Sequence, residues 1–113
     1  MKQYPWAQEF PGSVTVSDIH GTLLEMNDLA AEVFAEDGGM DLIGSNVFDC
    51  HPEPARSKLV ELYKTHRINV YTIEKHGKKK LIYQAPWFSE GTFAGYVELA
   101  LDIPVDLAHF IRD

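Results

Sequence analysis

Hydrophobic and polar positions alternate with a period of two over five stretches of the chain, a pattern typical of strands with one buried face. These stretches cover residues 13–18, 22–26, 68–75, 80–88 and 93–103. Asp18 and Gly21 begin and end the first connection, as expected of a β-turn. Gly77 and Gly91 lie in the short connections between the last three stretches. The pattern predicts a first hairpin and then a three-stranded antiparallel meander.

Helical spacing of apolar residues appears between the two groups of strands. Asn27 is a predicted N-cap for a helix over residues 28–36, which Gly38 would stop. A second predicted helix spans residues 54–66 and presents a single apolar stripe. The stripe consists of Leu59, Leu62 and Tyr63. A last short helix is predicted over residues 105–112.

The order of these elements predicts an α+β fold, with a five-stranded antiparallel sheet and short helices packed on one face. We expect three parts along the chain: an N-terminal aromatic arm (1–12), a folded domain (13–103) and a short C-terminal tail (104–113). The arm carries Tyr4, Trp6 and Phe10. Three aromatic side chains in seven positions are expected to pack against the domain or a partner.

Composition narrows the class of protein. The 113 residues suffice for one domain and carry a net charge of −7, which argues against a nucleic-acid or anionic-membrane partner. The single cysteine excludes an intramolecular disulfide. No apolar run reaches the length of a membrane span, and the N-terminus lacks the pattern of a signal peptide. We expect a cytoplasmic protein without an attached output domain.

Short motifs at fixed points along residues 13–103 resemble those of PAS domains, the small sensor modules of signalling proteins. The motifs are Asp18-Ile19-His20-Gly21, Asn27 with Ala30 and Phe34, Leu42 to Asn46, Lys75 to Lys79, Gly91 with Gly95, and Asp102-Ile103. The resemblance implies a bacterial sensory module that binds a small molecule between helices and sheet and signals through protein–protein contact. Pro104 departs from the family pattern, in which Thr usually leads into an output helix.

The last three predicted strands divide into two sets of alternate positions. The more apolar set is Tyr71, Ile73, Leu81, Tyr83, Ala85, Trp87, Val97, Leu99 and Leu101. The other set is Val70, Thr72, Ile82, Gln84, Pro86, Tyr96, Glu98 and Ala100. Apolar count alone places the first set in the core, whereas the resemblance implies that the second set faces the helices. Which face forms the core therefore stays open at this point.

The resemblance implies a ligand site lined by part of the second set and by two residues of the helical region. The polar candidates are Thr72, Gln84 and Glu98, and the apolar candidates are Val47, Tyr63, Val70, Ile82 and Tyr96. We expect a small organic ligand, and the sequence identifies no cofactor. The alternative is that Gln84 and Glu98 satisfy each other, no cavity remains, and the domain serves only dimerisation or scaffolding.

Two other kinds of chemistry were weighed against ligand binding. Cys50 and His51 adjoin a predicted helix start, where a thiol could become nucleophilic, but no third orienting group is identifiable. A haem sensor would need an axial histidine, for which His51 and His66 are the candidates. A small enzyme would use Glu98 or the Cys50–His51 pair as its base. We expect neither an enzyme nor a metal site.

The apolar character of both sheet faces predicts a homodimer. Whichever face the helices leave uncovered would expose more apolar surface than monomers usually do. We expect a second copy and the aromatic arm to cover it, and a separate signalling protein to receive the output.

Overall fold

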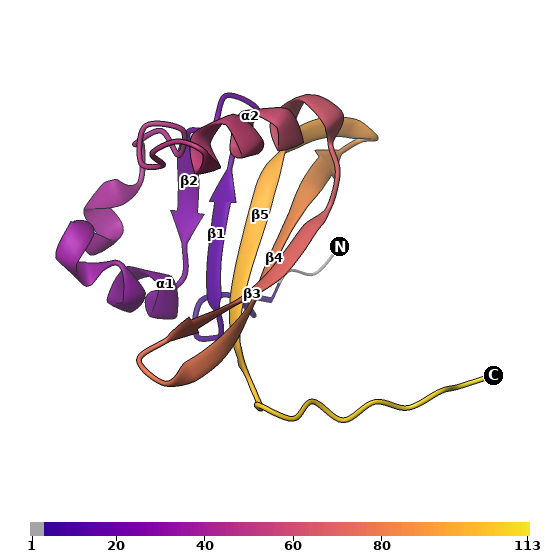
Figure 1. Cartoon of the computed structure of the whole chain (residues 1–113). Helices are drawn as coiled ribbons and strands as arrows, with labels where there is room; N and C mark the ends of the chain where they lie inside the picture. Colours follow the sequence, from indigo (N-terminus) through magenta and orange to yellow (C-terminus); the bar gives the residue numbers. More distant parts are fainter. Residues whose placement is uncertain (1–3) are drawn as a thin grey trace.

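The computed structural model describes residues 4–113, so the first three residues of the predicted arm lie outside the described residues. Five strands form one antiparallel sheet in the order β2-β1-β5-β4-β3 (Figure 1). They are β1 (Ser13–Ser17), β2 (Leu23–Met26), β3 (Asn69–Lys75), β4 (Lys78–Ser89) and β5 (Thr92–Ile103). The predicted five-stranded antiparallel sheet is confirmed.

Short helices connect β2 to β3. They are α1 (Asp28–Val33), the 3-10 turns η1 (Ala35–Asp37) and η2 (Gly39–Leu42), and α2 (Ala55–Thr65). The predicted helix over residues 28–36 is three residues too long, because the Phe34 carbonyl accepts from both Asp37 and Gly39 and tightens the chain. Gly38 and Gly39 then adopt positive φ. In Figure 1, α2 lies across one end of the sheet, and α1 lies beside β2 and β1.

Asn27 joins three parts of the chain through a buried side chain. Its Oδ1 accepts from the backbone N–H of Ala30 and of Val14, both at 3.0 Å, so the predicted N-cap is confirmed. Its Nδ2 donates to the carbonyls of Gly12 at 2.7 Å and Ala7 at 2.9 Å. One amide therefore fixes α1, β1 and the N-terminal arm relative to one another.

The register of the last three strands decides which side chains share a face. The two-residue turn His76-Gly77 pairs Lys75 with Lys78, so even positions of β3 lie opposite odd positions of β4. A bulge in β5 next to Trp87 adds one residue, so even positions of β4 lie opposite even positions of β5. The parity therefore changes once across the three strands.

This change of parity corrects the placement of two predicted site residues. Val70 pairs with Tyr83 and Thr72 with Leu81, on the face turned away from the helices. Asn69 and Tyr71 instead share the face of Gln84 and Ile82. The sequence interpretation gave all three strands the same parity, and it was wrong for β3.

The helix-facing side of the sheet carries the core. One buried cluster contains Leu59, Leu62, Tyr63 and Tyr96, and a second contains Leu23, Met26 and Ala30. Ile82 and Gln84 are also buried. The set implied by the resemblance therefore faces the helices in β4 and β5, although apolar count alone favoured the other set.

The opposite side of the sheet, the outer face, is only partly covered. Residues 4–8 lie beside Val14 and Val16 at the β1–β2 end, where Val14 is 5% exposed. Towards β3 the outer face is open, and Val70 is 48% exposed. Half-buried Tyr83, Val97 and Leu99 lie between these two regions.

The predicted helix over residues 105–112 is wrong. Residues 104–113 are exposed, contain no helical turn and extend away from the body of the molecule (Figure 1). Eight residues form too few hydrogen bonds to hold a helix unless an apolar face packs. Leu107 and Phe110 are 62% and 71% exposed, so no such packing occurs. Within residues 4–113, no helix has the length and apolar character needed to cross a membrane.

Candidate functional site

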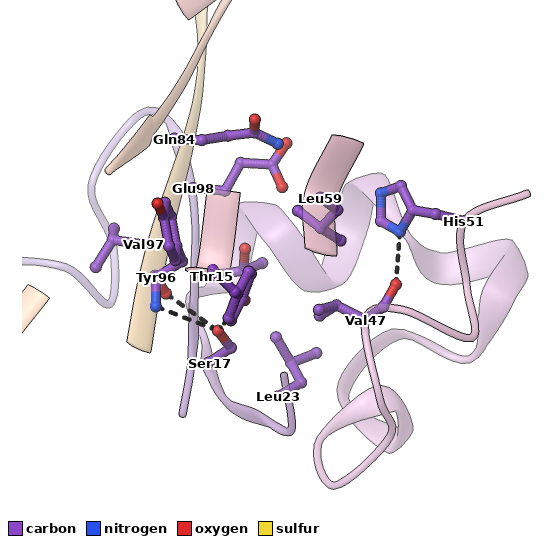
Figure 2. A pocket seen from close by; sticks show the side chains of 11 residues that line it. Thr15, Ser17, Leu23, Val47, His51, Leu59, Gln84, Tyr96, Val97 and Glu98 are labelled. Carbon is purple, nitrogen blue, oxygen red and sulfur yellow. Dashed lines mark hydrogen bonds between the residues drawn. The ribbon is translucent and has the colours of Figure 1, made fainter. Parts of the chain in front are cut away.

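A small cavity lies between α2, the segment that precedes it and the helix-facing side of the sheet (Figure 2). Its volume is about 40 Å³, which is space for two or three water molecules. The lining residues are Thr15, Ser17, Leu23, Val47, His51, Leu59, Tyr63, Gln84, Tyr96, Val97 and Glu98. The side chain of Val97 points away from the cavity in Figure 2.

A larger cleft adjoins this cavity between α2 and β3. Its volume is about 230 Å³, and it shares His51, Leu59 and Gln84 with the cavity. The other lining residues are Ala55, Lys58, Leu62, Asn69 and Tyr71. The three shared side chains therefore separate the small interior cavity from a more open cleft, and their movement would join the two spaces.

Glu98 is the acidic group of the cavity. Burial raises the pKa of its carboxyl, which the nearby His51 and a hydrogen bond with the Gln84 side chain lower in part. Gln84 is itself oriented by Asn69, whose Nδ2 donates to Gln84 Oε1 at 2.8 Å. Asn69, Gln84 and Glu98 thus form a polar chain that runs from the cleft to the interior.

His51 lies across the cavity from Glu98 (Figure 2). Its Nδ1 is 2.6 Å from the Val47 carbonyl. Because a carbonyl only accepts, Nδ1 carries a proton in this hydrogen bond. The hydrogen bond also holds the ring against the loop rather than against the sheet. A ligand group between His51 and Glu98 would therefore connect the loop to the sheet.

The floor of the cavity combines hydroxyl groups with aromatic rings. Ser17 Oγ hydrogen-bonds the Tyr63 hydroxyl and accepts from the Tyr96 backbone N–H at 3.3 Å. Burial raises the pKa of the Tyr63 hydroxyl. The Tyr96 hydroxyl lies 2.5 Å from the Leu62 carbonyl and 2.7 Å from that of Arg67, which ties the end of α2 to β5.

Five of the eight predicted site residues meet at the cavity. They are Val47, Tyr63, Gln84, Tyr96 and Glu98. Ile82 is 5% exposed on the same face but does not line the cavity. Val70 and Thr72 lie on the outer face, for the reason of register given above.

Sequence reasoning missed six of the eleven lining residues: Thr15, Ser17, Leu23, His51, Leu59 and Val97. Thr15 and Ser17 alternate in β1, and Thr15 pairs with Glu98, so the β1–β5 register would have placed both on the helix-facing side. Leu59 was assigned to the apolar stripe but not to the site. His51 lies in an irregular segment, where the sequence has no periodic pattern that would predict the direction of a side chain.

The alternative chemistries find little support in the geometry. Cys50 is exposed, whereas the neighbouring His51 is turned to the Val47 carbonyl and the cavity. His66 stacks on the Phe93 ring, with ring centroids 3.8 Å apart. Even together with the 230 Å³ cleft, the 40 Å³ cavity is smaller than the roughly 300–1,000 Å³ usual for pockets of organic ligands, so a group as large as a haem would need the site to expand. Within residues 4–113, no three His, Cys, Asp or Glu side chains gather in a way that could hold a metal ion.

Replacing Glu98 with glutamine is expected to stabilise the protein at pH 7 but not at pH 4. A raised pKa in the folded state means that the protonated carboxyl favours folding, and that this contribution is lost as the pH rises through the folded pKa. Glutamine is uncharged at both pH values. Urea unfolding at the two pH values checks this, with Glu61→Gln, an exposed carboxylate on α2, as the control. Equal effects of Glu98→Gln at both pH values would contradict the burial of a charge.

Comparison with known proteins gives a structural likeness without a sequence match. No family model matches the chain, and neither does a curated protein. A C-terminal domain from Streptococcus mutans superposes with a TM-score of 0.69 at 21% identity, over 85% of this chain and 78% of that one. The PAS domain of BvgS from Bordetella pertussis gives 0.61 at 19%, over 87% and 81%. The Aer2 receptor of Vibrio cholerae, a dual PAS-heme oxygen sensor, gives 0.61 at 15%, over 82% and 95%.

These likenesses agree with the strand order and with the helices on one face of the sheet. The chain has the fold of a PAS domain, as its sequence motifs indicate. The cavity lies between α2 and the central strands of that fold.

Proposed function

We propose that residues 13–103 form a sensory PAS module that binds a small organic molecule, with residues 1–12 and 104–113 as flanking arm and tail. The observation that carries this proposal is the convergence of Glu98, Gln84 and His51 on one cavity that continues into a cleft. The module acts by binding and conformational change rather than by catalysis. Its output passes through contact with another protein chain.

The dimensions of the site suggest how the ligand is held. The 40 Å³ cavity accommodates only a few atoms, so a small polar group enters it while the rest of the molecule occupies the 230 Å³ cleft. The Glu98 carboxylate is an acceptor, so the group that enters is a hydrogen-bond donor such as an amine or a hydroxyl. Leu59, Leu62 and Tyr71 offer apolar contacts to the remainder.

A thermal-shift screen with C4–C8 primary amines and the matching alcohols tests this ligand class. We expect at least one compound to raise the melting temperature of the wild type in a saturable way. Ala55→Trp, which fills the cleft, is expected to abolish the shift, whereas Lys64→Trp, at an exposed position of α2, is expected to keep it. A panel without any saturable shift, or equal shifts in both variants, would refute the proposed site.

The half-exposed outer face supports a homodimer as the route of output. Tyr83, Val97 and Leu99 are half-buried and adjacent on β4 and β5, on the face turned away from the helices. A twofold pairing is the commonest way to bury a self-complementary apolar patch. In this arrangement, a ligand that changes the curvature of the sheet changes the contact between the two copies.

Leu99→Glu is expected to convert the dimer to a monomer and to weaken association at least 100-fold, because it buries an unpaired charge at the centre of the contact. Sedimentation at micromolar concentration checks this, since the wild type should have twice the 12.8 kDa mass of the chain. Ile19→Glu places the same charge in an exposed turn and should leave the dimer intact. A 12.8 kDa wild type would rule out the dimer while leaving ligand binding untouched.

Dimerisation without a ligand is the second candidate function, since the same outer face would serve it. The screen described above separates the two, because a scaffold would dimerise and bind none of the compounds.

A further inference from the structure

A second concave site lies on the same side of the sheet, at the end away from α2. It is a groove of about 400 Å³ between α1 and the β3–β4 hairpin, with the ends of β1 and β5 as its floor. In Figure 1, α1 and this hairpin lie at the same end of the molecule. The volume is within the range usual for small organic ligands and is ten times that of the interior cavity.

The groove is positively charged in a protein whose net charge is −7. Its lining includes Lys75, Lys78, Lys80 and His76, and only one carboxylate, that of Asp102. Lys78 and Lys80 share that carboxylate, with N–O distances of 3.9 Å and 3.8 Å. One negative charge cannot neutralise two ammonium groups, so positive charge is left for a ligand.

The Lys80 side chain is more buried than that of the neighbouring Lys78. It is 20% exposed, against 70% for Lys78. It lies on the helix-facing side of β4 opposite Asp102, four residues from Gln84, or roughly 13 Å along the strand. Lys79 lies on the outer face opposite Glu74, so it carries the same charge but does not line the groove.

The walls of the groove are apolar, in contrast to its basic rim. Leu29 and Val33 project from α1, and Val33 is 36% exposed. Pro11 and Ala100 continue this apolar surface across β1 and β5. The helical spacing of residues 28–34 suggests a buried face for α1, yet Ala30 is the only residue of α1 that is buried. Leu29 and Val33 of α1 thus face an open groove.

We propose that this groove is a second ligand site, which takes a small anionic amphiphile: an organic carboxylate with an apolar body. The carboxylate lies between Lys75 and Lys80, and the apolar body packs on Leu29 and Val33. The site is distinct from the cavity at Glu98, whose acceptor groups suit a hydrogen-bond donor, so the same sheet face would bind ligands of opposite character at its two ends.

Titration of the ¹⁵N-labelled full chain with octanoate tests the proposal, with amide shifts followed by NMR. We expect saturable shifts confined to residues 29–33, 75–80 and 100–102. Lys80→Gln should weaken octanoate binding at least fivefold, whereas Lys79→Gln should change it less than twofold. Asp102→Asn removes the competing carboxylate and should tighten binding, an effect that loss of folding cannot imitate.

Two further probes separate charge recognition from general apolar binding. Octylammonium should not bind the groove, and octanol should bind at least fivefold more weakly than octanoate. Three results would overturn the proposal. Shifts could appear on the outer face or at Glu98 instead of the groove, or Lys79→Gln and Lys80→Gln could have equal effects. Binding could also fail to saturate by ten times the expected Kd of about 1 mM. Failure here leaves the amine and alcohol screen unaffected.

Discussion

Gly95→Ala is expected to destabilise the fold by at least about 3 kcal/mol, the combined cost of a strained backbone and an overpacked contact. Gly95 has a φ of +146°, and a Cβ placed there would lie 1.9 Å from the Ser17 carbonyl oxygen. That carbonyl also accepts from the Trp87 indole N–H at 2.9 Å. The close approach therefore fixes the end of β1 over β5 and positions Ser17 at the cavity floor.

Gly91→Ala provides the matched control, since Gly91 also has a positive φ of +79° but no atom within 4 Å of the added methyl group. It should cost about 1 kcal/mol, the price of a left-handed conformation alone. Urea denaturation of the two variants measures the difference. If Gly95→Ala lowered the free energy of unfolding no more than Gly91→Ala does, the Ser17 carbonyl could not lie against Gly95 as described.

Asn27→Ala is expected to cost about 3 kcal/mol, three times the usual value for the loss of an N-cap. The larger figure follows because the side chain is 5% exposed and also satisfies the Val14 N–H and the Gly12 and Ala7 carbonyls. Each buried polar group left without a partner costs about 1–3 kcal/mol. The loss should also release the arm, whose Ala7 carbonyl is held by Asn27.

Asn46→Ala is the comparison for this variant. Asn46 donates to the His20 carbonyl and accepts from the Phe48 N–H, but its bonds are exposed or part-buried, so the expected cost is about 1 kcal/mol. Chemical denaturation reports both values. Equal costs for the two asparagines would show that Asn27 acts as a helix cap and nothing more.

Local chemistry explains why most of the fold could be predicted from the sequence. Asp18 accepts from the N–H groups of His20 and Thr22, so its turn is encoded within five residues. Asn27 caps α1 from the adjacent position. The β3–β4 and β4–β5 turns each place two residues at positive φ, and each contains the glycine that suits such a turn.

What could not be predicted depends on contacts between distant residues. A single extra residue in β5 sets the parity of β4 against β5, and nothing in the alternation of Val97, Glu98 and Leu99 reveals it. The wrong placement of Val70 and Thr72 has a different cause, because the two-residue turn at His76-Gly77 sets even positions of β3 opposite odd positions of β4. His51 was missed as a lining residue because its orientation depends on a bond to the Val47 carbonyl within an irregular loop.

Native mass spectrometry of the protein purified from its own host tests the central claim most directly, because it detects a bound small molecule by mass alone. The account predicts an adduct of small-molecule mass on wild-type protein, retained in Lys64→Trp and lost in Ala55→Trp, where the cleft is filled. A wild-type spectrum that contains only the bare 12.8 kDa chain and its multiples, or an adduct that survives in Ala55→Trp, would contradict ligand binding at Glu98 and its neighbours.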